Sequence, residues 1–491
     1  MKKVMMIILA GLLALPLLSC GKKPEQQPTA APVSGTPLPD GVTADPNAAP
    51  SGKPIFFDPE TDYDNRYGSI ISCDMVETED AYYLHNRETN GFLYYYDNAS
   101  GESGVLCPRP ECVHDAKREN RECTGYLGYE LPSLQYYQGR LWFFESPYGR
   151  KIRLCHMNLD GSEKTLVHEF EPADTPLEYG NRRLYLHRGM IYYTTFNQTI
   201  SGAAIFHRIY YGCIPMEDTT IGGKKVRAWE CYSILERDTI HMPQPSMYFA
   251  GDYCYMLYDY DGVTDYDGAN TEEDYYAWKR TLPVTDEIDR WDPTMAEPEI
   301  LYQSVETYSM LGNYHGKYVA SDGTPYFTDS QRLDPEQPEG EDNPYITRLY
   351  RVEKDGSRTI VLETDPGEGS LFSFALGDGV IVLTGAPFMC MRDILEPVDI
   401  RIIRFDGDEP EVIYEGPLPL EYRSELRIGA KDISLEECWV NGDTLMIFST
   451  EYYGRKDYDR SWQFVKYDIT PDGLKETVLS EGFQVQFWKS N

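Results

Sequence analysis

The chain lacks an apolar run long enough to cross a membrane as a helix near its start. The stretch MKKVMMIILAGLLALPLLS, residues 1–19, is interrupted by Pro16 and falls short of the roughly 20 apolar residues that a span requires. Two lysines precede its apolar run, which is the pattern of a secretory signal peptide. We therefore expect residues 1–19 to be a cleaved leader.

Clusters of lysine and arginine are also missing. The 491 residues contain 45 Lys and Arg against 80 Asp and Glu, a formal net charge of −35. Binding to phosphate backbones requires clustered positive charge. We therefore exclude nucleic acid as a partner, and we expect the acidic body to be repelled by anionic lipid headgroups.

The motifs of several enzyme classes are absent. There is no G-x-S-x-G motif and no Walker or Rossmann glycine pattern, and the eight histidines are dispersed apart from His114. The acidic stretch 259–274 does not have EF-hand spacing, so we interpret it as a solvated loop. A carboxylate pair of the kind that glycoside hydrolases use has no sequence signature, and this alternative stays open.

The eleven cysteines do not form the pattern of a disulfide framework. Seven stand alone in strand-like tracts, where an isolated cysteine is most often a small buried hydrophobe. These seven are Cys73, Cys155, Cys213, Cys231, Cys254, Cys390 and Cys438.

One stretch, LCPRPECVHDAKRENRECTGY at residues 106–126, gathers soft ligands. Cys107, Cys112, His114 and Cys123 follow the spacing C-x4-C-x-H-x8-C, and three thiolates with one imidazole are a known ligand set for structural zinc. A disulfide, Cys107–Cys112 or Cys112–Cys123, is an alternative, as are free thiols beside a solvated turn. A catalytic zinc is disfavoured because four protein ligands leave no open position.

The end of the apolar leader, Leu17-Leu18-Ser19-Cys20-Gly21, resembles a bacterial lipobox. This resemblance implies that Cys20 carries lipid (thioether-linked diacylglycerol, with palmitate-type acyl chains) and anchors a lipoprotein at the extracytoplasmic face of the cell membrane. Residues 20–54 are rich in Pro, Ala, Gly, Thr and Ser, and we expect them to form a disordered tether.

From residue 55 to 491 the sequence repeats a turn, a strand, a second strand that ends in a polar turn, and a short apolar strand. The leading turns lie 50 to 65 residues apart, at Asp80, Gly139, Gly189, Gly251, Gly316, Asp378 and Gly442. Such repeats predict an all-β fold, a β-propeller of about seven four-stranded blades, with six or eight as alternatives. A pair of β-sandwiches is the competing architecture. Helix is expected to amount to a few turns at most, for instance around residues 272–280. Ring closure is expected to join the strand near GSIISCDMVE with the last strand, FQVQFWK.

The lipobox, the tether, the loop L-C-x-x-P-x-C-x-H-D…C and the Tyr-rich blades together resemble a group of Firmicutes lipoproteins with TolB-like or YncE-like propellers. The loop motif is carried by Leu106, Cys107, Pro110, Cys112, His114, Asp115 and Cys123. The resemblance implies a lipid-anchored propeller and assigns no activity.

These observations favour a non-catalytic binding or scaffold module for an envelope protein, peptide or glycan. The only cofactor that we consider is a structural zinc. The aromatic segment 449–462 is one candidate contact surface. The alternative is a surface carbohydrate-active hydrolase or lyase, which predicts two or three carboxylates converging at the channel mouth.

Overall fold

The computed structural model describes these residues: 57–67, 73–86, 90–114, 120–128, 133–145, 151–171, 176–178, 183–201, 204–266, 271–307, 317–320, 322–332, 345–363, 373–376, 380–384, 399–405, 410–419, 430–453 and 459–485. The predicted signal peptide, Cys20, the tether and Cys390 lie outside them. Within these ranges no helix has the length and apolar character that a membrane crossing would need.

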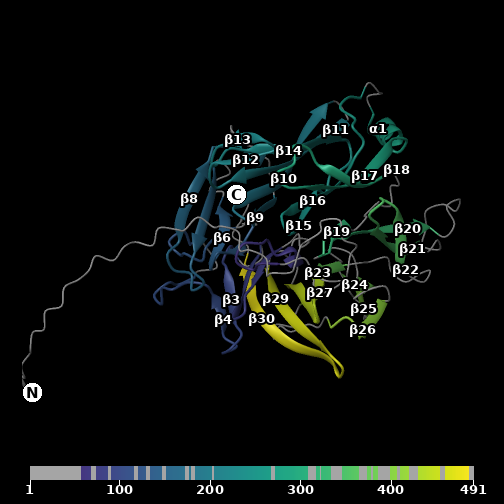
Figure 1. The fold of residues 1–491 in the computed structure, drawn as a ribbon. Coiled ribbons are helices and arrows are strands. Elements are labelled where there is room, and N and C mark those ends of the chain that lie inside the picture. Colours follow the sequence, from purple (N-terminus) through teal and green to yellow (C-terminus); the bar gives the residue numbers. More distant parts are fainter. Residues whose placement is uncertain are drawn as a thin grey trace, which may run out of the picture. The chain divides into compact units, whose positions relative to one another are not determined.

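The described chain forms seven four-stranded antiparallel sheets, coloured in chain order in Figure 1. Blade 1 comprises β1 (Cys73–Glu77), β2 (Ala81–Asn86), β3 (Tyr94–Asp97) and β4 (Ser103–Val105). Blade 2 comprises β5 (Gln135–Tyr137), β6 (Arg140–Glu145), β7 (Ile152–Met157) and β8 (Thr165–Phe170). Blade 3 comprises β9 (Arg183–His187), β10 (Met190–Ser201), β11 (Ala204–Pro215) and β14 (Tyr232–Thr239). A two-stranded hairpin, β12 (Thr219–Ile221) and β13 (Lys224–Val226), is inserted in blade 3.

The remaining four blades follow the same order of pairing. Blade 4 comprises β15 (Ser246–Ala250), β16 (Tyr253–Tyr260), β17 (Pro283–Trp291) and β18 (Glu299–Thr307). Blade 5 comprises β19 (Lys317–Val319), β20 (Pro325–Arg332), β21 (Tyr345–Val352) and β22 (Arg358–Glu363). Blade 6 comprises β23 (Ser373–Leu376), β24 (Val380–Thr384), β25 (Asp399–Phe405) and β26 (Pro410–Pro417). Blade 7 comprises β27 (Ala430–Asn441), β28 (Thr444–Tyr453), β29 (Asp459–Thr470) and β30 (Gly473–Val485).

Helical structure in the described ranges is confined to three short elements. The α-helix α1 (Glu272–Lys279) lies between β16 and β17, as the sequence predicts, and two 3-10 turns are η1 (Asn65–Tyr67) and η5 (Pro176–Glu178). Thr271 caps α1, because its hydroxyl accepts a hydrogen bond from the backbone N–H of Asp274.

Burial identifies the inner and outer strands of a blade. In β9, the first strand of blade 3, four of five residues are buried, whereas β22, the fourth strand of blade 5, has no buried residue. First strands therefore line the centre of the ring and fourth strands face solvent.

Six apolar cores are shared by neighbouring blades, and these cores connect all seven blades in a closed circuit. Blades 1 and 2, 2 and 3, 3 and 4, and 6 and 7 each share one core. One core joins blades 4 and 5 to Ile403 of blade 6, and another joins blade 7 back to blade 1. No sheet has to bury its faces alone, which is the principle of a β-propeller. The predicted fold class is confirmed, with seven blades.

Ring closure brings the first and last strands into one core, as predicted, but their described residues do not pair with each other. The first strand, β1, pairs with β2, and the last strand, β30, pairs with β29. Blades 7 and 1 meet instead through side chains, for example the rings of Tyr94 and Trp462, whose centroids are 4.9 Å apart. Every blade is made from one continuous segment, so closure rests on packing between sheets.

Five of the predicted leading turns, at Asp80, Gly139, Gly189, Gly251 and Gly442, fall between the first two strands of their blades. Asp378 of blade 6 lies outside the described residues, and so does Gly316, which precedes β19 in blade 5. The first hairpin of blade 5 turns at Asp322-Gly323, where Gly323 has a φ of 81°. The sequence around β19 offers two glycines, Gly316 and Gly323. The first hairpin turns at Gly323, which follows an aspartate, as is common in turns.

Residues 57–67, here called the strap, lie against the ends of the inner strands. Asp62 accepts two hydrogen bonds from Arg188, at 2.7 and 2.9 Å, and the backbone N–H of Tyr63 donates to Nδ1 of His187. Asn65 makes two hydrogen bonds with the backbone of Phe249 in blade 4. The strap thus lies at the end of the ring where the inner strands finish. The inner strands begin at the opposite end of the ring.

Candidate metal centre and charged cluster

The four residues of the Cys/His loop are brought together. One ligand atom from each of Cys107, Cys112, His114 and Cys123 lies within 4.8 Å of the others. All three cysteines are free thiols, with Cys123 buried and the other two partly buried. The sequence motif therefore corresponds to one compact ligand group in space.

Backbone pairing with blade 1 holds both ends of this loop. Leu106 donates to the carbonyl of Leu93 at 2.8 Å, and Leu93 donates to the carbonyl of Gly125 at 2.7 Å. Leu106 is buried in the core between blades 1 and 2. Cys107 and Cys123 are each within two residues of these anchored positions, so the sheet edge places their thiols side by side.

The surroundings favour a thiolate on one cysteine and disfavour it on another. Burial alone would raise the pKa of Cys112, but the backbone N–H of His114 and the Arg109 guanidinium stabilise its thiolate, so the pKa lies below its usual value. Burial and the neighbouring Cys107 raise the pKa of Cys123 to about 12. Burial and the charge of Arg109 lower the pKa of His114, which keeps the imidazole neutral and able to act as a ligand.

The donor set fits a tetrahedral soft-metal site. With metal–sulfur bonds of about 2.3 Å, two sulfurs on one tetrahedral zinc lie roughly 3.8 Å apart, so the group needs to contract by only about 1 Å. The Nε2 atom of His114 is buried and has no hydrogen-bond partner. Such an orphaned nitrogen beside three thiols is what a metal-ligand group shows before the metal is added. The cluster could therefore hold a metal ion.

Gly125 is expected to be intolerant of a side chain. A Cβ at this position would lie 2.1 Å from the carbonyl oxygen of Leu106, and such overpacking costs about 3 kcal/mol. G125A should therefore lower the free energy of unfolding in urea by about that amount and weaken metal retention. G104A is the control, since its Cβ would meet only Tyr95 at 3.7 Å. Equal stability of the two variants would contradict this account of the loop.

A second group of charged residues lies between blades 4 and 5. Lys317, at the start of inner strand β19, forms ion pairs with Asp259 and with Asp286, the latter at 2.5 Å. Asp259 and Asp286 face each other across β16 and β17. The Lys317 and Asp286 side chains are each 8% exposed, whereas Asp259 is 33% exposed. Burial raises the pKa of Asp259 to about 7, against the opposing charge of Lys317.

The sequence did not indicate this charged cluster. Asp259 begins the stretch that we interpreted as a solvated acidic loop, and that interpretation is wrong for its first residues. Asp259 belongs to β16, and the carboxylate of Asp261 is fully buried and accepts hydrogen bonds from Thr239 and Ile240. The available signal was the strand-like alternation of YCYMLYDY before the acidic run, which predicts that the strand extends to residue 260.

Comparisons with known proteins add no family. No protein-family model and no curated protein matches the chain. A Mycobacterium tuberculosis puromycin-hydrolysing peptidase is 14% identical with a TM-score of 0.40, over 87% of this chain and 56% of that one. A proposed 6-phosphogluconolactonase from Bacteroides uniformis is 10% identical with a TM-score of 0.37, over 80% of this chain and 94% of that one.

An ulvan lyase from a polysaccharide lyase family is 10% identical with a TM-score of 0.39, over 87% of this chain and 96% of that one. Of these three proteins, the Mycobacterium tuberculosis peptidase is matched over little more than half of its own length. The class of this protein, a β-propeller, is defined by its own sheets and their shared cores.

Proposed function

We propose that this protein is a lipoprotein of the bacterial cell envelope whose propeller binds an envelope protein, peptide or glycan. In this proposal the signal peptide 1–19 is removed, Cys20 carries the membrane lipid, and residues 20–54 tether the propeller outside the membrane. One observation carries the binding role: a platform built outside the ring that leaves apolar side chains exposed.

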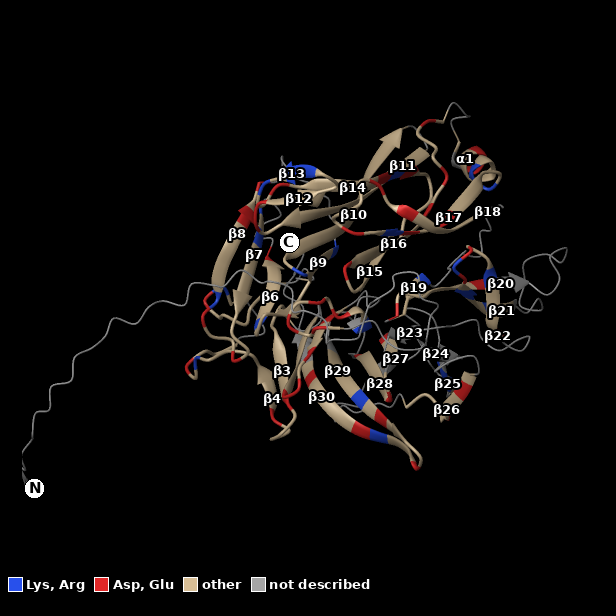
Figure 2. Ribbon diagram, viewed as in Figure 1, with Lys and Arg blue, Asp and Glu red and all other residues tan. Residues whose placement is uncertain are grey.

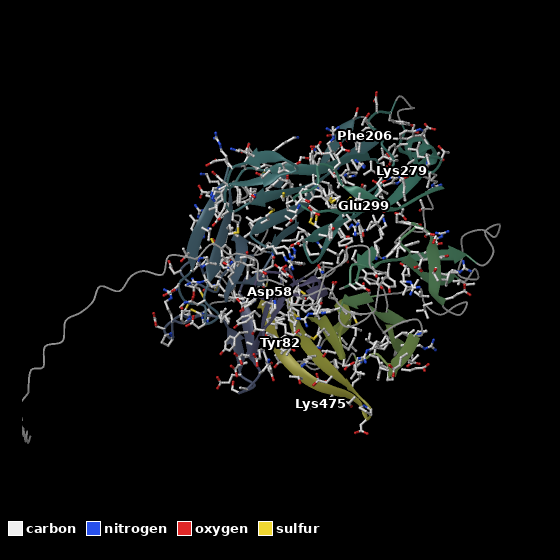
Figure 3. All side chains as sticks on the ribbon, in the orientation of Figure 1. Asp58, Tyr82, Phe206, Lys279, Glu299 and Lys475 are labelled. Atoms are coloured by element: carbon white, nitrogen blue, oxygen red, sulfur yellow. The ribbon has the colours of Figure 1, made fainter. Side chains whose placement is uncertain are left out.

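The platform consists of the outer part of the β10–β11 hairpin, residues 240–242, and the described parts of the β16–β17 connection, residues 261–266 and 271–282. Its own small core contains Ala204, Phe206, Ile240 and Tyr275. The Tyr275 hydroxyl donates a hydrogen bond to the carbonyl oxygen of Ile205 at 3.2 Å, which holds α1 against the hairpin. Figure 3 labels Phe206 of the hairpin and Lys279 of α1, which lies in the β16–β17 connection.

Large apolar side chains are exposed on three segments of the platform. Ile200 is 68% exposed, Met242 64% and Tyr276 45%. Exposed apolar residues that gather on one structure mark interaction surfaces more often than scattered ones do. The platform does not contribute to the cores that close the ring, so its separate core supports a role in recognition.

Of the aromatic segment 449–462, the structure describes residues 449–453 and 459–462. The first group belongs to β28 and the second to β29, and Ser449, Thr450, Glu451 and Trp462 are buried. The described aromatic residues therefore occupy strand positions of blade 7. For these residues the prediction of an exposed contact loop is wrong, and residues 454–458 lie outside the described ranges.

The triple variant I200N/M242Q/Y276S is expected to lose binding. The full-length chain would be tested against purified envelope fractions and a glycan array, with a photo-crosslinker placed at position 242. Because each buried apolar anchor contributes about 1–3 kcal/mol at an interface, the loss should exceed tenfold. The control is I300N/V305N on the outer strand β18, where the two side chains are 53% and 64% exposed. Equal binding by both variants, or no ligand for the parent chain, would overturn the proposal.

The metal that we propose for the Cys/His loop is a structural zinc. Four protein ligands close a tetrahedral site, so the ion would cross-link the loop without an open position for substrate. The expected result is one equivalent of zinc per chain by elemental analysis. Two missing thiols without metal would instead indicate a disulfide.

The alternative is a carbohydrate-active hydrolase or lyase. It is favoured by one observation: Asp259 and Asp286 converge on Lys317 at the end of the ring where inner strands begin. Against it, the same lysine neutralises both carboxylates, and Asp286 is nearly buried. Release of reducing or unsaturated ends from an envelope polysaccharide, abolished by D259N, would favour this alternative over the binding module.

A further inference from the structure

Two buried carboxyl groups, those of Glu287 and Asp289, meet at the buried hydroxyl of Tyr258 in blade 4. The Tyr258 oxygen lies 2.7 Å from Oδ2 of Asp289 and also contacts Oε1 of Glu287. All three residues are almost completely buried: Tyr258 and Asp289 are 1% exposed and Glu287 is 0% exposed. Their protonation is therefore decided by one another and by the few groups that face them.

The number of hydrogens limits the arrangement. A phenol has one hydrogen, so Tyr258 can donate to only one of the two carboxyl groups. Burial raises the pKa of Tyr258, so it keeps that hydrogen. If both acids were ionised, one carboxylate oxygen would face the phenol oxygen with no hydrogen between them. One of the two acids must therefore carry a proton of its own.

The surrounding donors decide which acid is ionised. Glu287 accepts hydrogen bonds from three side chains: Arg237 at 3.1 Å, Gln303 at 2.6 Å and Tyr260 at 3.2 Å. By contrast, Oδ1 of Asp289 is buried without a hydrogen-bond partner. Three donors, one of them charged, stabilise a carboxylate on Glu287, whereas nothing comparable faces Asp289.

We infer that Asp289 is a neutral carboxylic acid at pH 6 and the first member of a hydrogen-bond chain that joins blades 3 and 4. Asp289 donates to Tyr258, Tyr258 donates to Glu287, and Glu287 pairs with Arg237 of β14. Burial and the charge of Glu287 together raise the pKa of Asp289 to about 7, against the opposing effects of Tyr258 and Arg237. The guanidinium of Arg237 also lies 5.6 Å from the ring centroid of Tyr258.

The proton has a defined effect on stability. The pKa of Asp289 is higher in the folded chain than in the unfolded chain, where it is about 3.9. Its contribution is therefore fully present below about pH 4 and is lost as the pH rises through about 7. Above that pH the chain of hydrogen bonds lacks a hydrogen, and Glu287 and Asp289 repel each other across Tyr258. β16 and β17 carry the platform connection, so this is also the base of the platform.

The test compares two isosteric amides in the full-length chain. In D289N the amide N–H replaces the acid O–H and cannot ionise, so the thermal midpoint of D289N at pH 6 should fall no more than about 2 °C below that of the parent. The parent's midpoint should fall relative to that of D289N between pH 6 and pH 9. E287Q removes the partner of Arg237 and should lower the midpoint at pH 6 by at least about 4 °C.

Infrared spectroscopy provides a readout that does not depend on stability. The parent at pH 6 should show a protonated-carboxyl C=O band that disappears in D289N and on titration to pH 9. A D289N midpoint that falls as far as that of E287Q, or a band that survives in D289N, would overturn the inference. A stable E287Q beside an unstable D289N would place the proton on Glu287 and would also overturn it.

Discussion

Replacing Lys317 by methionine is expected to destabilise the folded chain by about 3–5 kcal/mol at pH 8, the cost of removing one partner of a buried ion pair. The Lys317 ammonium is the shared partner of Asp259 and Asp286, and its side chain is 8% exposed. In K317M two carboxylates of like charge would face each other across β16 and β17 with no cation between them. Urea unfolding of the full-length chain, followed by tryptophan fluorescence, measures the loss.

The pH dependence of this variant is also expected to change. The carboxyl of Asp259, whose pKa is already near 7, becomes protonated as the pH falls, and a neutral acid does not need Lys317. The deficit of K317M should therefore shrink between pH 8 and pH 5. The triple variant K317M/D259N/D286N removes the charges together and should recover most of the lost stability at pH 8. A K317M variant within 1 kcal/mol of the parent at pH 8 would show that the cluster is solvated.

Removal of metal from the Cys/His loop is expected to have a similarly large effect. If zinc binds the folded chain and is present at about a thousand times its Kd, it stabilises the fold by about 4 kcal/mol, and this contribution disappears with a chelator. Cys123 is buried and Nε2 of His114 has no hydrogen-bond partner, so a bound ion would lie inside the loop. The measurement is urea unfolding with zinc, with chelator, and with chelator followed by excess zinc.

C123S is the matched variant for this experiment. It replaces one ligand by a group of similar size that binds zinc poorly, so its stability should be low and insensitive to zinc. C155S is the control, because Cys155 is also buried but lies in β7 outside the ligand group. Zinc sensitivity that persists in C123S, or none in the parent, would contradict the proposed centre.

The acidic character of the chain is distributed over the whole described propeller. Figure 2 shows Asp and Glu on most of the blades, and the net charge is −35. Many of these groups pair with arginine on a neighbouring strand, such as Arg208 with Asp238 and Arg153 with Glu169, both at 2.7 Å. Paired surface charges of this kind contribute little stability individually. The binding role we propose therefore rests on the apolar platform.

Sequence periodicity was sufficient for the strands and insufficient for their closure. Tracts such as RLWFF and TLMIF are strands because alternation and flanking turns are local properties of the chain. The turn of blade 5 was misplaced because two glycines lie within a few residues of each other. Closure by packing could not be predicted, since Tyr94 and Trp462 are far apart in the chain and their contact depends on the ring being formed.

The sequence by itself determined the repeating blades, the short helix α1 and the gathering of four soft ligands within one loop. Each of these depends on neighbours a few residues apart, where strand geometry and turn chemistry act directly. Only the tertiary structure decided that Lys317 meets Asp259, that Arg237 reaches Glu287, and that the strap covers one end of the ring. These contacts join different blades, and their energy comes from burying charges whose partners are brought close by the packing of whole sheets.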